Sequence, residues 1–377
     1  MDFEPSDDQR LLVESVTRML RDTYDFTRRK SYMALPEGYS PAVWSQFAEL
    51  GLLGLPFAEE YGGFGGSAQE VMLVMQAFGR VLVLEPYFPT VVLGGAAVNL
   101  AGSAAQKQAI LPAIAEGGLK LAFAHSERQA RYDLTDVVTT AKRGGGWVLD
   151  GSKTVVSHGE AADKIVVSAR TGGERYDEDG ITLFLVDAGA SGVARRGYVS
   201  RDDTRAADIS LSNVSVSDAD VLGEVGGGLP IIRRVIEAGI AATAGETVGA
   251  MEAMNEMTLE YAKTRVQFGQ PIGSYQVVQH RLADMFMAQE QGRSMAMLAT
   301  MSIDNPDDGA RAHDIALAKV GVGQAGRYVS QSAVQVHGGI GMTEEYAVGH
   351  YFRRCMVIER LFGDPAYYLA RLAAEVG

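Results

Sequence analysis

The chain has 377 residues, with 34 Lys and Arg against 47 Asp and Glu, which leaves a formal net charge of −13. This length predicts roughly two or three domains, and 47% hydrophobic with 21% charged residues is typical of a globular protein. The negative charge argues against nucleic acid and anionic membranes as partners, since both attract Lys and Arg. The one cysteine, Cys355, excludes an intrachain disulfide framework and a Cys-rich zinc or iron–sulfur site.

The start of the chain, Met1–Pro5, is acidic and lacks the basic and apolar segments of a signal peptide. The most apolar long stretch, Val81–Ala101, is interrupted by charged, polar and proline residues. No run therefore reaches the roughly 18 apolar residues that a membrane span needs. We expect a cytoplasmic protein without a membrane span.

From Ser6 to about Gly118 the apolar residues recur at helical spacing. Asp7 or Asp8 is placed to cap the first helix, and Ser40 precedes a proline at the first helical position of another. A glycine-rich stretch, 61–67, then breaks the chain, and Ser67 is placed to cap the next helix. These glycines form either a loop or a backbone segment that approaches a ligand closely.

From about Lys120 to Leu222 the hydrophobic period changes to two, which is typical of strands. Strands are predicted at residues 137–142, 147–149, 165–169, 181–186, 193–196 and 209–211. The first two flank Arg143–Gly146, a pattern typical of a hairpin. The zone predicts a small β-barrel or sandwich.

From Leu229 onward the chain is helical again, with long segments at 229–265, 274–302 and 307–336. Long helices with short connections predict an antiparallel bundle. The expected fold class is α+β, with an N-terminal α-helical domain at 1–119, a β domain at 120–224 and a C-terminal four-helix-bundle domain at 225–377.

Several kinds of active site are missing from the sequence. There is no His-Glu-x-x-His, no histidine pair at metal-ligand spacing, no Gly-x-Ser-x-Gly and no P-loop. The Gly-x-x-Gly at 338–341 follows a helix and not a strand, so it is not a Rossmann fingerprint. Metal chemistry, serine hydrolysis and nucleotide-driven work are therefore not expected.

Two segments combine residue types that suit a nucleotide. Arg265–Ile272 places a guanidinium and the aromatic Phe268 between two long helices, where they can grip a pyrophosphate and stack on a base. The alternative is a helix end with Arg265 paired on the surface. Gln335–Gly341 offers consecutive glycines at a helix end, which either expose backbone N–H groups to an anion or simply stop the helix.

These segments, with others spread along the chain, resemble the acyl-CoA dehydrogenase family. The matching stretches are Glu49–Pro56, Glu59–Gly63, Asp150–Lys153 and Tyr261–Gly269. The resemblance covers essentially the whole chain and agrees with the α–β–α order. It implies a tetramer in which each FAD lies across two subunits.

By this resemblance, one set of residues holds the ADP half of a FAD whose flavin lies in a neighbouring subunit: Arg265, Phe268, Gln276, Gln335, Gly338 and Gly339. The flavin half in the β domain is reduced. The hydroxyls of Ser126 and Ser157 remain, but the glycines and proline that follow the first hydroxyl in the family are absent. Val155 stands where the family has a stacking tryptophan.

The resemblance also implies a catalytic carboxylate at one of two positions, and both are empty. The glutamate near the C-terminus is replaced by Phe362, and the alternative glutamate on the long helix is replaced by Gly239. Asp364 is a weak candidate for a relocated base; the plainer expectation is that it caps a helix starting at Pro365. Glu246 is expected to be a buried structural partner.

The chain thus keeps the residues expected to bind the ADP half of a neighbour's FAD. It lacks the base and much of the flavin-contacting pattern that it would need for a reaction of its own. It looks most like the small, non-catalytic subunits of the pimeloyl-CoA dehydrogenase type in bacterial heterotetrameric acyl-CoA dehydrogenases. The resemblance implies a second family member carrying the catalytic glutamate, an acyl-CoA substrate from fatty acid or steroid side-chain β-oxidation, and electron-transfer flavoprotein or a similar acceptor. The alternatives are a self-sufficient homotetrameric dehydrogenase, oxidase or monooxygenase, and a non-enzymatic assembly protein.

Three further residues lie near the expected cofactor stretch. Arg128, Arg131 and Lys153 can supply positive charge for CoA phosphates, although solvated surface residues are the alternative. His158, beside Ser157, either hydrogen-bonds the flavin or fills the space of the lost tryptophan.

Overall fold

The computed structural model describes residues 6–376 and, at residue 376, the backbone only. The acidic start of the chain, Met1–Pro5, for which no signal peptide is expected, lies outside this part. Contacts divide the chain into two compact units. Within the described residues, unit 1 comprises 6–31, 67–83 and 240–376, and unit 2 comprises 32–66 and 84–239. Between residues 6 and 376, no helix is both long and apolar enough to cross a bilayer.

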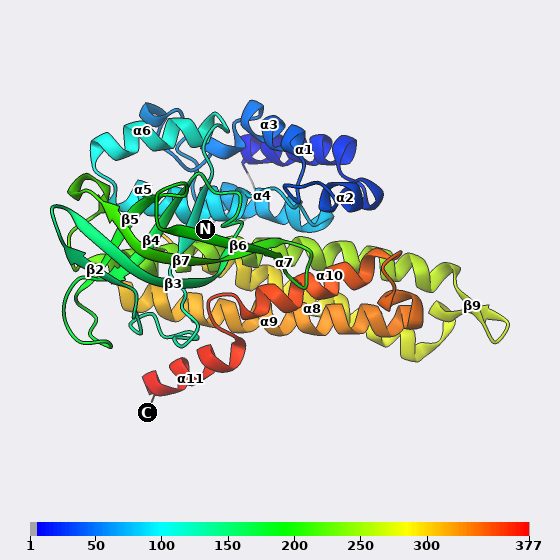
Figure 1. Cartoon of the computed structure of the whole chain (residues 1–377). Coiled ribbons are helices and arrows are strands. Elements are labelled where there is room, and N and C mark those ends of the chain that lie inside the picture. The colour runs from blue at the N-terminus through cyan, green and yellow to red at the C-terminus, as the bar shows by residue number, and fades with distance from the viewer. Residues whose placement is uncertain (1–5, 377) are drawn as a thin grey trace. The chain divides into compact units, whose positions relative to one another are not determined.

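Unit 1 is helical, and Figure 1 shows its long helices side by side. Its helices are α1 (Asp7–Thr23), α4 (Ala68–Val81), most of α7 (Gly228–Thr264), α8 (Gln276–Ser302), α9 (Asp308–His337), α10 (Ala347–Arg360) and α11 (Pro365–Val376), with most of α2 (Phe26–Met33) and the 3₁₀ turns η5 (Ile272–Ser274) and η6 (Gly338–Met342). A short hairpin, β9 (Val266–Gln267) and β10 (Gln270–Pro271), joins α7 to α8 and projects beyond the bundle (Figure 1). The predicted long helices are confirmed within two residues at each end.

Unit 2 combines a β sheet with shorter helices. The strands are β1 (Leu121–Ala124), β2 (Thr140–Arg143), β3 (Trp147–Ser157), β4 (Lys164–Arg170), β5 (Ile181–Asp187), β6 (Val193–Val199), β7 (Arg205–Val216) and β8 (Val221–Leu222). The helical elements are α3 (Pro41–Glu49), η1 (Leu52–Gly54), η2 (Glu59–Tyr61), η3 (Phe88–Gly95), α5 (Ala96–Ala101), α6 (Ala104–Ala115), η4 (Asp218–Asp220) and the start of α7. The expected α+β class is confirmed.

The eight strands form one sheet in the order β6-β7-β3-β2-β4-β5-β8, and β1 pairs with β4. The predicted hairpin is confirmed, because Arg143 lies opposite Trp147 in an antiparallel pair. β3 and β7 are longer than predicted. Their ladder is interrupted by register shifts between Leu149 and Gly151 and between Lys153 and Val156, and such bulges break the period-two pattern that marks a strand in sequence.

Helix caps follow the sequence signals closely. The side chain of Ser40 accepts a hydrogen bond from the N–H of Val43, and Ser67 forms a capping box with Glu70. The first helix differs from expectation. Its cap is Ser6 and not Asp7 or Asp8, because Gln9 completes a capping box with Ser6.

The glycine-rich loop 61–67 packs against protein backbone. A Cβ at Gly63 would overlap the carbonyl oxygens of Phe57 and Gly54, and one at Gly66 would contact the carbonyl of Leu55 at 2.8 Å. These two glycines are therefore explained by close packing within unit 2, which favours the loop interpretation over a ligand contact.

Glycines also bring α4 and α7 together in unit 1. A Cβ at Gly79 would overlap the carbonyl oxygen of Glu246, and one at Gly249 would overlap that of Gln76. The backbones of the two helices are thus nearly in contact. This close crossing fixes the central part of α7.

We predict that Gly249→Ala lowers the free energy of unfolding by about 1–3 kcal/mol, because the added methyl group forces α4 and α7 apart. Gly172→Ala is the control, since an added Cβ there meets nothing within 4 Å. Chemical denaturation of both variants measures the difference. Equal stability of the two would contradict the close crossing.

Candidate cofactor half-site

Arg265 lies directly after α7, at the base of the projecting hairpin. Its N–H donates to the carbonyl of Tyr261 at 2.8 Å, and its own carbonyl accepts from the N–H of Ile272 at 2.8 Å. The backbone is thus held at both sides. The guanidinium is exposed and has no hydrogen-bond or ion-pair partner within residues 6–376. Arg265 thus lies at a helix end, as the alternative expected, but no ion pair within the described residues supports the pairing part of that alternative.

Phe268 lies at the tip of the hairpin and is 96% exposed. It has φ 52° and is followed by Gly269 with φ 85°, the two left-handed residues of a type I′ turn. A left-handed phenylalanine is uncommon, and such strain persists where the surroundings or a function require it. A bare aromatic ring on a projecting turn is well placed to contact a ligand or another subunit.

The end of α9 presents open backbone. Gly338 has φ 63°, and its N–H donates to the carbonyl of Val334, so it ends the helix as the plainer interpretation expected. An added Cβ at Gly338 or Gly339 would meet nothing within 4 Å. The space beside both glycines is therefore free for a ligand to approach the main chain.

A stack of side chains joins the ends of α7 and α9. The ring of His337 lies 4.4 Å from that of Tyr261 and 5.0 Å from that of Tyr346. The Nδ1 atom of His337 is 2.8 Å from the carbonyl oxygen of Ala333. Burial lowers the pKa of His337, against the opposing effect of that carbonyl. In the sequence His337 stands out only as the residue before the glycines, and no local signal marks its place in this stack.

The structure brings the predicted ADP-binding residues to one end of the unit 1 bundle. Gln276 is the first residue of α8, directly after the hairpin, and Gln335 lies in the last turn of α9. All the predicted residues of this half are exposed: Arg265, Phe268, Gln276, Gln335, Gly338 and Gly339. We call this set the open half-site. Its guanidinium, aromatic ring, amides and bare backbone suit an adenosine diphosphate group.

The second predicted half lies in unit 2. The carbonyl of Ser126 accepts a hydrogen bond from the N–H of Thr154 at 2.9 Å, which ties its segment to β3. Ser157 is the last residue of β3. Both side chains are half-buried. Between them, Val155 has φ 53° and is 60% exposed, so no ring occupies the place of the family's tryptophan.

His158 is packed away from solvent. It is 5% exposed, its N–H donates to the carbonyl of Arg205 at 2.9 Å, and its ring lies edge-on to Tyr39 at 6.0 Å. Of the two interpretations left open for His158, these contacts favour the one in which it fills space.

A buried ion pair holds the segment around Ser126. The Nζ atom of Lys153 lies 2.7 Å from Oε1 of Glu127, and both side chains are almost fully buried. Glu127 also accepts hydrogen bonds from the N–H groups of Val138 and Thr139. Burial alone would raise the pKa of Glu127, but the Lys153 ammonium and hydrogen bonds from Gln129 and Val138 lower it to about 2.

This pair corrects one of the expectations for charge near the cofactor. Lys153 is neither a solvated surface residue nor available to a CoA phosphate, because its ammonium is buried against Glu127. Arg128 and Arg131 are exposed. The sequence alone could not distinguish the buried lysine from the two exposed arginines, because the ion-pair partner of a lysine in a strand cannot be recognised from the sequence around it.

Both positions at which the family resemblance implied a base lack a carboxylate. Gly239 lies in α7 and is buried. Phe362 lies between α10 and α11 with φ 62°, and its carbonyl accepts from the hydroxyl of Tyr368 at 2.9 Å. The turn that would present a carboxylate is thus formed and held, with a phenylalanine in it.

The two carboxylates considered as replacements for the base already accept hydrogen bonds within the chain. Oδ1 of Asp364 accepts from the N–H of Tyr367 at 2.9 Å, in the first turn of α11. Glu246 is buried and receives two hydrogen bonds from Arg354, at 2.6 and 2.8 Å. The structural roles expected for both residues agree with these contacts.

We predict that Glu127→Gln lowers the free energy of unfolding by about 3–5 kcal/mol at pH 7, because it leaves the Lys153 ammonium buried without its counter-charge. The folded-state pKa of Glu127, about 2, lies below its ordinary value of 4.5. Its ionised form therefore stabilises the native protein above pH 4.5, and this contribution is lost as pH falls toward 2.

Denaturation between pH 2 and 7 tests this, with the double variant Glu127→Gln, Lys153→Met as the control. The double variant should be more stable than Glu127→Gln alone, since it buries no unpaired charge. A Glu127→Gln protein with the acid sensitivity of the wild type in this range would contradict the assignment.

Comparison with known proteins matches nearly the whole chain. The models of the acyl-CoA dehydrogenase N-terminal, middle and C-terminal domains match residues 6–118, 122–214 and 226–377. The probable acyl-CoA dehydrogenase YngJ of Bacillus subtilis is 28% identical, over 99% of this chain and 98% of that protein.

Solved structures agree. Butyryl-CoA dehydrogenase from Megasphaera elsdenii superposes with a TM-score of 0.91 at 26% identity, over all of both chains. A chain of the ChsE4-ChsE5 complex from Mycobacterium tuberculosis superposes with a TM-score of 0.89 at 26% identity, over 100% of this chain and 99% of that one. With three domain models matched in order along nearly its whole length, the chain belongs to the acyl-CoA dehydrogenase family.

Proposed function

We propose that this chain is the base-less subunit of a heteromeric FAD-dependent acyl-CoA dehydrogenase. In this role it supplies the ADP-binding half of a FAD site whose flavin half lies in a partner of the same fold. The observation that carries the proposal is the contrast between the open half-site, whose Arg265 has no partner within the described chain, and the two base positions, held by Gly239 and Phe362.

The residues of the open half-site fit the ADP half of FAD, the cofactor of this family. Arg265 would pair with the pyrophosphate and Phe268 would stack on the adenine, while Gln276 and Gln335 offer amide hydrogen bonds. The backbone near Gly338 and Gly339 is open to the same ligand. When bound, FAD supplies the acceptor for the hydride that leaves the β-carbon of the acyl thioester.

The base for this reaction would come from the partner. Removal of the α-proton by a positioned carboxylate is worth about 10²–10⁴-fold in rate. In this chain Asp364 caps α11 and Glu246 is paired with Arg354. These contacts favour a structural role for both carboxylates over that of a relocated base. The catalytic glutamate and the fuller flavin contacts are therefore assigned to a second family member.

Heteromeric relatives support this assignment. The similar structure from Mycobacterium tuberculosis is a complex of ChsE4 and ChsE5. Another relative, 28% identical over 84% of this chain and of that protein, is named as a subunit of a caffeyl-CoA reductase-Etf complex from Acetobacterium woodii. We propose an acyl-CoA as the substrate and an electron-transfer flavoprotein or similar carrier as the acceptor.

We predict that Arg265→Met in this chain weakens FAD binding by the co-expressed complex about 10- to 100-fold, since a charge-assisted hydrogen bond contributes about 1.5–3 kcal/mol. Lys263→Met is the matched control. Lys263 is also exposed at the end of α7, but a separation of two residues turns it about 200° away from Arg265. Flavin absorbance after dialysis and titration with FAD measure both. Equal retention by the two variants would refute the role of Arg265.

A second prediction separates this proposal from a self-sufficient enzyme. Asp364→Asn keeps the helix cap, because asparagine caps as well as aspartate, but it cannot act as a base. The complex carrying Asp364→Asn should keep kcat within about twofold of the wild type. A loss of 10²-fold or more, with unchanged flavin content, would show instead that the base has moved into this chain.

A further inference from the structure

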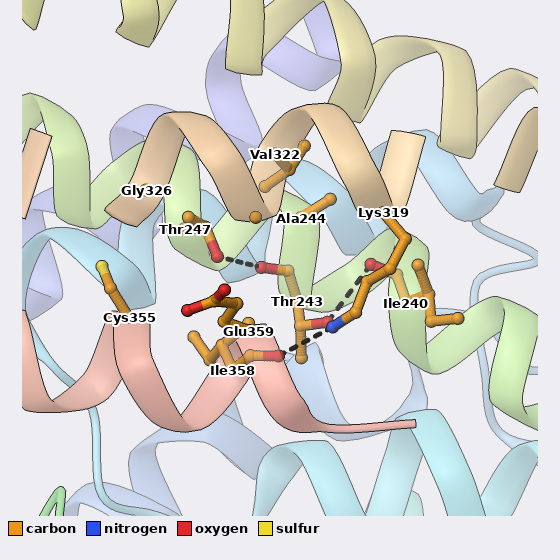
Figure 2. A pocket seen from close by; sticks show the side chains of 11 residues that line it. Ile240, Thr243, Ala244, Thr247, Lys319, Val322, Gly326, Cys355, Ile358 and Glu359 are labelled. Carbon is orange, nitrogen blue, oxygen red and sulfur yellow. Dashed lines mark hydrogen bonds between the residues drawn. The ribbon is translucent and has the colours of Figure 1, made fainter. Parts of the chain in front are cut away.

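A small cavity with a few polar groups lies inside the unit 1 bundle, away from the open half-site. It is enclosed by α7, α9 and α10, and Figure 2 shows the side chains that surround it. Its polar lining comes from Thr243 and Thr247 of α7, Lys319 of α9 and Glu359 of α10. The proposed function uses none of these groups.

Lys319 brings more hydrogen-bond donors to this cavity than the described chain satisfies. It is 5% exposed, and its Nζ atom donates to the carbonyl of Ile358 in the last turn of α10 at 2.7 Å. An ammonium group has three N–H donors, and this is the one hydrogen bond of Nζ within residues 6–376. Buried donors normally find partners in protein or in ordered water.

Glu359 brings an acceptor to the same cavity. It is 3% exposed; Oε1 accepts a hydrogen bond from Arg327, whereas Oε2 is buried and has no hydrogen-bond partner in the described part of the chain. Lys319 and Glu359 both line the cavity, yet they form no ion pair within 4.0 Å among the described residues. A buried donor and a buried acceptor thus line one cavity without a direct bond between them.

We propose that this cavity binds one ordered water molecule that bridges Lys319 and Glu359. The water accepts a hydrogen bond from Nζ of Lys319 and donates one to Oε2 of Glu359. Its second proton goes to Oγ1 of Thr243, which already donates its own hydrogen to the carbonyl of Ile240 at 3.2 Å and so faces the water as an acceptor. Three partners are typical for a buried water.

The size and charge of the cavity favour water over an ion. The space is close to the smallest that accommodates a water molecule. The ammonium of Lys319 disfavours a cation, and the carboxylate of Glu359 disfavours an anion. Burial lowers the pKa of Lys319 to about 7, against the opposing charges of Glu359 and Asp364. Water suits either form of this amine because it both donates and accepts.

The bridge would link three helices at a defined place. Lys319 reaches the last turn of α10 from α9, and a lysine there satisfies a carbonyl that the helix end leaves open. The water extends this contact to Glu359 and to Thr243 of α7. We therefore assign to it the role of holding the end of α10, just before the turn that contains Phe362.

A crystal structure of the assembled protein at better than about 2 Å resolution tests the proposal directly. The expected result is a density peak within 2.6–3.2 Å of both Nζ of Lys319 and Oε2 of Glu359. A cavity without density, or a direct contact between the two side chains, would overturn it. This test does not depend on the identity of the partner or on activity.

Two variants provide the solution test. Lys319→Met removes the donor at similar length, and Glu359→Gln keeps a hydrogen-bonding group at the far side. If one water joins them, the loss of thermal stability in the double variant is smaller than the sum of the two single losses. Strictly additive losses would contradict a shared bridge. The wild-type density decides the matter should either variant fail to fold.

Discussion

The stack of His337 on Tyr261 is the contact on which the open half-site depends. Tyr261 lies one turn before Arg265 on α7, and His337 directly precedes Gly338 at the end of α9. This contact joins two helix ends that are far apart in sequence, with the two ring centres 4.4 Å apart. A neutral imidazole suits this place because it packs as an aromatic ring while its Nδ1 atom bonds the carbonyl of Ala333.

Paired interior charges contrast with the exposed residues of the open half-site, and this contrast supports a shared site. Two interior carboxylates, Glu127 and Glu246, form ion pairs with Lys153 and Arg354. The outward-facing Arg265 and Phe268 have none within the described residues, and the phenylalanine is in a strained backbone conformation. Strain and exposure at a projecting turn are costs that contact with another molecule offsets. A subunit that lends half a cofactor site accounts for this pattern.

Much of the fold could be predicted because helix length, caps and strand alternation are local signals. Ser40 and Ser67 cap the helices that the sequence indicated, and the residues of the family motifs lie at one end of the unit 1 bundle. Three features could not be predicted. Phe88–Gly95 is a fully buried π-helix, in a stretch that its sequence marked only as apolar. Lys153 is buried and forms an ion pair with Glu127, 26 positions away. Lys319 donates a hydrogen bond to a carbonyl on another helix. Such tertiary partners leave no local trace in the chain.

The central claim is that one FAD is built from this chain and a partner, and flavin stoichiometry tests it most directly. The chain would be purified alone and after co-expression with a family member that retains the catalytic glutamate, and flavin absorbance and native mass would be measured on each sample. The account predicts colourless protein alone and a yellow tetramer with about one FAD for every two chains on co-expression. A yellow homotetramer of this chain with one FAD per chain would contradict it.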